Sequence, residues 1–366
     1  MKDWVVFINP SAYPCDVGGI EIFNYYLIKK LSEKDDLHLL TLCKKYKNNN
    51  TISVHFLRKC KFNKVTQPLQ IFLFLVKNRS KIKILHISFS KAYWTHWFIY
   101  VIANRLLGIT YIITIHGGSM AVWKPTLPYK LFFKYAESIT GVSDRIINEY
   151  NRRSGREIIY TPPLIPFSVI QPKNKYRSKW LVSEVEIVLL YVGSLKPLKS
   201  VDTLIEALGL IKKEVIIKNK LKVLIAGDGI SRKGLITRVK ELGLEKTISF
   251  LGNIRREEIP ELYNLADIYT ICSEFEGLPI STLEAFANKI PCITSDAPGL
   301  NELSINNKNT LMFKTKDSSD YSKKIELLLN NQELKEELSE NAYNFYKNQF
   351  SYQNLADKFK SLINKT

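Results

Sequence analysis

Two glutamates eight positions apart, Glu276 and Glu284, stand in the stretch EGLPISTLEA. Pro279 suits the start of a helix, where its missing N–H is not needed, so a helix is predicted from Pro279 to about Asn288 after an apolar strand. The free N–H groups of Ile280 and Ser281 then form an anion site that fits a diphosphate. Carboxylates accept hydrogen bonds from paired hydroxyls, so the two glutamates suit the sugar and the ribose of a nucleotide sugar. The alternative is an ordinary strand–turn–helix unit with solvated acids.

Three other places carry residues that could act on such a ligand. Gly18 and Gly19 follow the first apolar run and open a helix, where glycine lets the backbone approach a phosphate, although tight-turn packing explains the pair equally well. They form no G-x-G-x-x-G pattern, which argues against a dinucleotide dehydrogenase. His116 ends the apolar run YIITIH, and Lys199 follows the run EIVLLYVG. No D-x-D occurs and no residues have metal-ligand spacing, so no metal and no cofactor are expected.

Short apolar runs alternate with segments of helical period, which is typical of a parallel sheet covered on both faces. The strands are predicted at residues 4–9, 37–42, 53–57, 82–88, 111–116, 138–143, 157–161, 186–193, 222–227, 248–252, 267–273, 291–295 and 309–313. The alternation of strands and helices begins again after the polar, basic stretch QPKNKYRSKW, residues 171–180, which is interpreted as the interdomain linker. An α/β protein is expected, with two doubly wound domains facing across a ligand cleft.

Three segments follow from this pattern. Residues 1–175 form a basic N-terminal domain on the acceptor and membrane side, and residues 176–345 form a donor-binding domain. Residues 346–366 form a C-terminal helix that packs back on the first domain.

The charge of the chain is uneven. The net charge is +18, and between Asp36 and Glu137 there are 16 Lys and Arg residues but no acidic residue. Such a distribution favours an anionic partner, namely a phospholipid surface, a lipid-linked phosphate or a nucleic acid, over solvated lysines alone. Two aromatic and basic segments, 92–107 and 121–136, are candidates for a membrane surface. For residues 92–107, a core helix is slightly favoured over a membrane-surface helix, because apolar residues occur on nearly every side of the helix.

The location is predicted from the absence of export signals. The apolar stretch of MKDWVVFINP is too short for a signal peptide and is interpreted as the first strand. Residues 98–115 are apolar but interrupted by Asn104, Arg105 and Gly108, which favours a buried helix followed by a strand over a membrane span. The five cysteines are scattered and form no C-x-x-C pair, so no disulfide framework or zinc site is expected and a reducing cytoplasm fits best.

The segment SEFEGLPISTLEAFA resembles the E-x7-E signature of family-four retaining glycosyltransferases, which have the GT-B fold. YVGSLKPLKSVDTLIEAL, KVLIAGDG and ISFLGN resemble further segments of that family in the expected order, so the resemblance covers nearly the whole chain. Ser194 and Ser200 stand where the family has Arg and Gly, which removes one phosphate charge. Lys196 is a candidate to replace it.

The resemblance implies a role for each matching residue. Glu276 and His116 contact the transferred sugar, with Gly277 and Leu278 beside it, and Glu284 binds the ribose. The remaining positions bind the diphosphate of the donor: Gly18, Gly19, Ser194, Lys199, Ile280 and Ser281. Front-face attack, in which the leaving phosphate accepts the proton of the acceptor, is the mechanism that the resemblance implies.

The expected function is the transfer of a hexose-type sugar, with retention, from a nucleotide sugar to a glycan or lipid-linked acceptor. UDP is preferred over GDP as the nucleotide. The setting is bacterial capsule or lipopolysaccharide synthesis, with the enzyme bound peripherally at the inner face of the plasma membrane and no nucleic acid as partner. Two alternatives remain. A nucleic-acid-binding protein would leave the glutamate pair unexplained, and a sugar-nucleotide epimerase or glycan phosphorylase would share the architecture.

Overall fold

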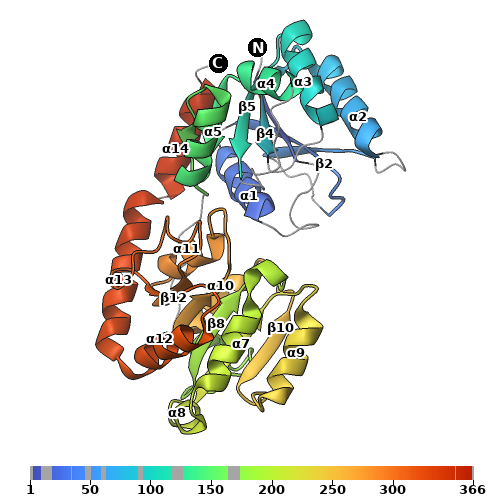
Figure 1. Cartoon of the computed structure of the whole chain (residues 1–366). Helices are drawn as coiled ribbons and strands as arrows, with labels where there is room; N and C mark the ends of the chain where they lie inside the picture. Colours follow the sequence, from blue (N-terminus) through green and yellow to red (C-terminus); the bar gives the residue numbers. More distant parts are fainter. Residues whose placement is uncertain are drawn as a thin grey trace. The chain divides into compact units, whose positions relative to one another are not determined.

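The computed structural model describes residues 3–9, 19–33, 35–45, 51–58, 63–89, 94–116, 127–163, 174–350 and 352–364. The chain divides into two compact units, one made of Met1–Pro166 with Tyr352–Thr366 and one made of Phe167–Ser351. Each unit is a parallel sheet with helices packed on it (Figure 1). All thirteen predicted strands are found within the described residues, and the GT-B class predicted from sequence is confirmed.

The first unit contains a seven-stranded sheet in the order β3-β2-β1-β4-β5-β6-β7. Its strands are β1 (Trp4–Ile8), β2 (Asp36–Thr41), β3 (Ile52–Phe56), β4 (Ile82–Phe89), β5 (Thr110–Ile115), β6 (Ser138–Gly141) and β7 (Ile159–Tyr160). All pairings are parallel, and β1 lies between β2 and β4 with Phe7 beside Leu39 and His86. The central strands are buried on both faces, which is why they read as continuous apolar runs.

In the described part of the chain, this unit has six helices. They are α1 (Gly19–Leu31), α2 (Asn63–Asn78), α3 (Trp94–Leu107), α4 (Leu127–Lys134), α5 (Asp144–Ser154) and α14 (Tyr352–Asn364). α3 packs between α2 and α4, whereas α1 packs against α14. In α14, Ala356, Phe359 and Leu362 are buried in the core of the first unit, so the end of the chain completes the first domain.

The second unit contains a six-stranded parallel sheet in the order β10-β9-β8-β11-β12-β13. Its strands are β8 (Ile187–Val192), β9 (Leu221–Ala226), β10 (Ile248–Gly252), β11 (Ile268–Ile271), β12 (Cys292–Ser295) and β13 (Leu311–Phe313). The strand order reverses between β8 and β11, and ligands of open α/β sheets bind at such a switch point. The loops that follow β8 and β11 are therefore the places to look for a site.

The helices of the second unit follow the same α/β alternation. They are α6 (Asn174–Arg177), the 3₁₀ turn η2 (Pro197–Lys199), α7 (Val201–Leu210), α8 (Lys213–Lys218), α9 (Arg232–Glu241), α10 (Ile259–Leu265), α11 (Ile280–Ala287), α12 (Ser318–Asn330) and α13 (Gln332–Gln349). α6 falls within the stretch that the sequence suggests as a linker. There Arg177 is buried and donates to the carbonyl oxygens of Ser183 and Glu186, which ties α6 to the start of β8.

Two sequence predictions about the first half are resolved by the structure. α3 ends at Leu107 and β5 begins at Thr110, with Gly108 at φ +63° between them, as predicted for a helix followed by a strand. Among the described helices, none combines the length and apolar character needed to cross a membrane.

The cysteines differ from the prediction at one position. Cys43 is disulfide-bonded, whereas Cys272 and Cys292 are free and buried. Sequence spacing could not predict this bond, because a disulfide depends on which thiols the fold brings within a few ångströms.

Candidate functional site

The turn between β11 and α11 holds Glu276. The Nζ of Lys199 and the Oγ of Ser273 donate to the Oε1 of Glu276 at 2.5 and 2.6 Å. Lys199 comes from η2, which follows β8, so the switch point brings together two residues that are 77 positions apart in the chain. An ammonium and a hydroxyl on one carboxylate oxygen make charge-assisted hydrogen bonds, which hold the carboxylate in a defined place. Ser273 was not among the residues predicted from sequence.

The turn is supported from behind by Gly299, whose φ is +88°. The Glu276 N–H donates to the carbonyl oxygen of Pro298 at 2.9 Å. A Cβ on Gly299 would lie only 2.0 Å from the carbonyl oxygen of Glu276, so no other residue fits without moving the turn. Gly299 was not among the residues predicted from sequence, although the Pro–Gly dipeptide after β12 is a signal for a tight turn.

α11 begins at Ile280, with Pro279 as its N-cap at φ −76° and ψ 101°. This start is one residue later than predicted, because Pro279 has an extended ψ and supplies the first acceptor carbonyl, to Thr282 and Leu283. Ile280 and Ser281 are thus the first two residues of the helix, whose N–H groups have no intrahelical acceptor. They lie directly after Gly277 and Leu278, which are half-buried in the turn.

The hydroxyl of Ser281 is held by a buried tyrosine. The Tyr269 hydroxyl donates to Ser281 Oγ at 2.8 Å, and the Tyr263 hydroxyl donates to the Ser281 carbonyl oxygen at 2.9 Å. Burial raises the pKa of Tyr269 well above its usual value, so this hydroxyl keeps its proton. The first turn of α11 is therefore anchored to β11 and α10.

Glu284 lies inside α11 and is buried. Its Oε1 accepts from the Nη2 of Arg256, which comes from the loop between β10 and α10. The side chains of Arg256 and Glu284 are only 12% and 7% exposed, so this is a buried ion pair. Arg256 was not predicted as a site residue. The only signal in the sequence was that the loop after Gly252 carries two consecutive arginines.

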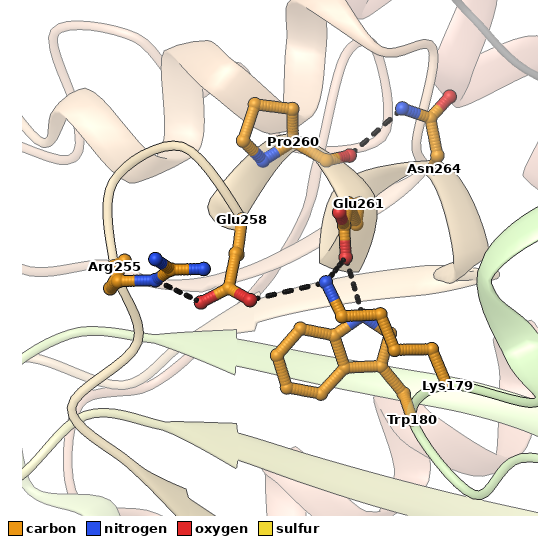
Figure 2. A network of polar contacts seen from close by, with 7 residues as sticks. All are labelled: Lys179, Trp180, Arg255, Glu258, Pro260, Glu261 and Asn264. Atoms are coloured by element: carbon orange, nitrogen blue, oxygen red, sulfur yellow. Dashed lines mark hydrogen bonds and ion pairs between the residues drawn. The ribbon is translucent and has the colours of Figure 1, made fainter.

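The loop that carries Arg256 is tied down on its outer side. Figure 2 shows Arg255 donating to Glu258 at 3.0 Å, and Lys179 bridging Glu258 and Glu261 at 3.1 and 2.5 Å. The indole N–H of Trp180 also donates to Glu261 at 3.1 Å. The Arg255 and Lys179 cations lower the pKa of Glu258 to about 2. This network attaches the Arg256 loop to the segment that enters the second unit.

The loops after β8 and β9 lie against each other around Ser194. A Cβ on Gly227, at φ +145°, would lie 1.8 Å from the carbonyl oxygen of Gly193. The Leu195 N–H donates to the Asp228 carbonyl oxygen at 2.9 Å, and the Tyr191 hydroxyl donates to the Ser194 carbonyl oxygen at 3.2 Å. Ser194 is thus placed by its backbone. Lys196, the candidate to replace the arginine of the family, is exposed.

Ser200 shows how this chain tolerates a side chain where the family has glycine. Its φ of 45° lies in the left-handed region, and its Oγ donates to the Oε1 of Glu274 at 2.8 Å. Lys316 pairs with the other oxygen of Glu274 at 2.8 Å. Lys316 and the Ser200 hydroxyl lower the pKa of Glu274, so this carboxylate stays ionised and holds the serine in its left-handed conformation.

In the first unit, His116 directly follows β5. Its Nε2 lies 3.2 Å from Ser88 Oγ, and Ser88 donates to Asn24 Oδ1 at 2.8 Å. The ring also contacts the edge of Phe23 in α1, with centroids 4.6 Å apart. Burial lowers the pKa of His116 to about 3, so the imidazole is neutral at physiological pH. It can exchange hydrogen bonds with a sugar hydroxyl but carries no charge.

Of the predicted glycine pair, Gly19 is the first residue of α1, and Gly18 lies outside the described residues. Across the described ranges, no group of three or more His, Cys, Asp or Glu residues could hold a metal ion. The structure therefore gathers Lys199, Glu276, Ile280, Ser281 and Glu284 around the β8 and β11 ends of the second sheet. It places His116 at the β5 end of the first.

Comparisons with known proteins agree with this architecture. Residues 172–345 match the family model for glycosyl transferases group 1. Over 374 residues, the chain is 24% identical to N-acetyl-alpha-D-glucosaminyl L-malate synthase of Bacillus anthracis, covering 97% of this chain and 96% of that protein. Over 160 residues, 43% of either chain, it is 32% identical to the GalNAc-alpha-(1->4)-GalNAc-alpha-(1->3)-diNAcBac-PP-undecaprenol alpha-1,4-N-acetyl-D-galactosaminyltransferase of Campylobacter jejuni.

Among solved structures, HepE of Anabaena in complex with UDP-glucose superposes with a TM-score of 0.82 at 16% identity, covering 100% of both chains. At this identity the likeness shows the fold. Taken together, the two Rossmann-like units, the family match of the second unit and these relatives support a glycosyltransferase of the GT-B type.

Proposed function

We propose that the chain transfers a hexose-type sugar from a nucleoside diphosphate sugar to a glycan or lipid-linked acceptor, with retention of the anomeric configuration. The observation that carries this proposal is the arrangement of Lys199 and Ser273 on Glu276, next to the free first turn of α11. The Lys199 cation from η2, the Glu276 carboxylate and the first N–H groups of α11 match the diphosphate and the adjoining sugar of such a donor.

The charge of the diphosphate is met by protein groups. The N–H groups of Ile280 and Ser281 add their partial positive charge to that of Lys199. A donor phosphate would compete with Glu276 for the Lys199 ammonium and so release carboxylate lone pairs to accept from sugar hydroxyls. Groups already in place when the leaving diphosphate gains charge stabilise the transition state without reorganisation. We propose that this suffices without a metal or other cofactor.

Glu284 is assigned to the ribose. Its burial and its bond from Arg256 hold the carboxylate at one place in α11, and a carboxylate keeps acceptor sites beyond the single oxygen that Arg256 occupies. His116 is assigned to the transferred sugar by the family resemblance. Its neutral state supports a hydrogen-bonding role and argues against service as a cationic acid.

The proposed chemical step is a front-face displacement. The bond between the anomeric carbon and the diphosphate oxygen breaks, and the acceptor oxygen bonds to the same face of that carbon. The leaving diphosphate oxygen takes the proton of the acceptor hydroxyl. This route needs no protein base, which agrees with a site whose carboxylate is already held by a lysine and a serine.

The donor and acceptor classes come from the comparisons and the charge pattern. HepE was crystallised with UDP-glucose, which supports UDP over GDP as the nucleotide. The name of the Campylobacter relative specifies an undecaprenol-linked acceptor, and the first unit of this chain is strongly basic. We propose that the enzyme acts at the inner face of the plasma membrane in bacterial surface polysaccharide assembly, of the capsule or lipopolysaccharide type.

The test is a donor screen followed by two single substitutions. UDP-, GDP- and ADP-sugars are compared for their effect on Tm, and the best donor is tested for slow hydrolysis. Glu284→Ala should weaken donor binding by about tenfold or more, because a hydrogen bond to a charged group is lost. Glu276→Ala should reduce turnover by about 10²-fold or more and leave nucleotide binding largely intact. Glu245→Ala, which changes an exposed glutamate of the same unit, is the matched control.

The possible outcomes separate the alternatives. Normal transfer by both variants would refute the site assignment. Epimerised free nucleotide sugar, or turnover that requires inorganic phosphate, would indicate a GT-B epimerase or phosphorylase. Salt-sensitive binding to DNA without nucleotide-sugar hydrolysis would indicate a nucleic-acid-binding protein.

A further inference from the structure

α2 carries an apolar stripe on its outer side. Leu69, Leu73 and Val76 are 55%, 58% and 42% exposed, and their spacing of four and three residues places them along one face of the helix. The opposite side of α2 is anchored in the core through Ile71 and Leu75, which are buried. α2 therefore has one apolar side that packs on the sheet and a second that faces outward.

α3 and α4, which follow α2 in a row of packed helices, also expose apolar side chains. α2 packs against α3, and α3 packs against α4, so the three helices lie side by side (Figure 1). α3 exposes Phe98 and Leu106, and α4 exposes Leu127. The exposed apolar residues of these helices are called the α2–α4 face below: Leu69, Leu73, Val76, Phe98, Leu106 and Leu127.

The charged side chains described as exposed on these three helices are all positive. The exposed cations on or beside the three helices are Lys77, Arg79, Arg105, Lys130 and Lys134. The whole interval between Asp36 and Glu137 contains no acidic residue, so no carboxylate within these helices can neutralise them. Arg105 and Lys134 both lie over the ring of Tyr135, at 5.1 and 5.7 Å, which gathers positive charge where α3 meets α4.

Exposed leucines beside uncompensated lysines and arginines suit a bilayer better than the other anionic partners. An amphipathic surface helix places its apolar side at the acyl boundary and its cations among anionic headgroups. A nucleic acid backbone would match the cations but leave the leucines in water. An acidic protein partner would match both, and in the test below it would correspond to a chain that does not float with anionic vesicles.

We infer that the α2–α4 face is the membrane-binding surface of this protein, and that it rests on a bilayer containing anionic lipids with Leu69, Leu73 and Val76 at the acyl boundary. This inference rests on the proposed function in one respect, namely that a lipid-linked acceptor gives membrane binding its purpose. It places the main contact on α2, whereas the sequence pattern pointed only to residues 92–107 and 121–136.

The experiment measures flotation of the full chain with vesicles of phosphatidylcholine, with and without phosphatidylglycerol. The protein should float with the anionic vesicles only, and less at high ionic strength. The triple variant Leu69→Ser, Leu73→Ser, Val76→Ser should lower the partition coefficient by about tenfold or more. Lys77→Glu should lower it by at least about fivefold, because each cation near the surface contributes about 1 kcal/mol.

Matched variants on the second unit control for general effects. Leu210→Ser with Ile217→Ser removes two exposed apolar side chains elsewhere, and Lys218→Glu reverses an exposed lysine there. Both should float as the wild type does. In a direct test of contact, brominated lipids should quench the emission that Leu73→Trp adds to that of the wild type, and should not quench the emission that Ile217→Trp adds. Because the substituted side chains are exposed, far-ultraviolet circular dichroism should be unchanged in all variants.

Donor binding distinguishes failure of this inference from failure of the proposed function. Stabilisation by UDP-glucose is measured without vesicles, and the triple variant should retain it. Loss of UDP-glucose binding in the wild type, with vesicle binding intact, would refute the proposed function alone. Equal flotation of wild type and triple variant, no flotation at all, or dimerisation through Leu73 would overturn the membrane-binding surface.

Discussion

Replacing Arg256 by methionine should destabilise the second unit strongly, although Arg256 lies in a loop. The side chain of Arg256 is 12% exposed and that of its partner Glu284 is 7% exposed. Methionine fills a similar volume but leaves the Glu284 carboxylate buried without its cation. Removing one partner of a buried ion pair costs about 3–5 kcal/mol. We expect Arg256→Met to lower the free energy of unfolding by an amount near this range.

A double-mutant cycle separates the effect of the unpaired buried charge from the effect of lost packing. In Arg256→Met with Glu284→Gln, the buried charge is gone, so most of the lost free energy should return. Arg238→Met is the control, because Arg238 also pairs with a glutamate, Glu206, but the two side chains are 41% and 40% exposed. Exposed pairs contribute only about 0–1 kcal/mol.

The assay is urea unfolding of the full chain at pH 7, followed by circular dichroism. The wild type is compared with four variants: Arg256→Met, Glu284→Gln, their double variant and Arg238→Met. The free energy of unfolding is taken to fall with urea concentration at the same slope in all of them. If Arg256→Met lowers the free energy of unfolding no more than Arg238→Met does, burial does not set the cost of losing the ion pair and the prediction is refuted. It is also refuted if the double variant is as unstable as the sum of the two single variants. Either result would show that the Arg256–Glu284 pair is solvated in solution.

Two further predictions concern backbone geometry and pH. Gly299→Ala should abolish sugar transfer and cost more than about 3 kcal/mol of stability, because its Cβ would lie 2.0 Å from a carbonyl oxygen of the site turn. Gly243→Ala, at φ +66° with open space around the new Cβ, should cost only about 1 kcal/mol and keep activity, and both costs are read from urea unfolding. Burial lowers the pKa of His86 and of His116 to about 3, below the unfolded value of about 6.5. The unfolded chain therefore binds protons first, so the stability that these neutral rings contribute is complete above pH 6.5 and is lost as the pH falls toward 3. Between pH 6.5 and pH 5, each such histidine should make the wild type lose up to about 1.4 kcal/mol of stability per pH unit. His86→Gln should reduce this loss in urea unfolding, and an unchanged pH slope would contradict the prediction.

Much of the fold was predictable because its signals are local. β-strands buried on both faces must be apolar along their whole length, so the central strands of the two sheets appear as short apolar runs. The start of α11 was predicted to within one residue, because Pro279 has a fixed φ and lacks an N–H that the first helical turn would leave unpaired. Glu276 and Glu284 stand in one contiguous motif, so their spacing along the chain already indicated a site.

The contacts of Lys199, Gly299 and Arg256 with the motif could not be predicted, because these residues come from other segments of the chain, whereas Ser273 stands only three positions before Glu276. Lys199 was expected near the diphosphate by resemblance, but its bond to Glu276 depends on β8 and β11 being neighbours in the sheet. Ser273, Gly299 and Arg256 carry no motif of their own, and each acquires its role through a contact with the motif.

The sequence by itself therefore determined the two parallel sheets, their helices and the site motif, because period, turn chemistry and residue type act over a few neighbouring positions. Only the tertiary structure decided which charged side chains form ion pairs. It pairs Arg256 with Glu284 and exposes the apolar side of α2, because ion pairing and exposure depend on distance in space. The free energy of a buried charge or an exposed leucine depends on the groups that surround it in the folded protein, and the order of residues along the chain does not specify those groups.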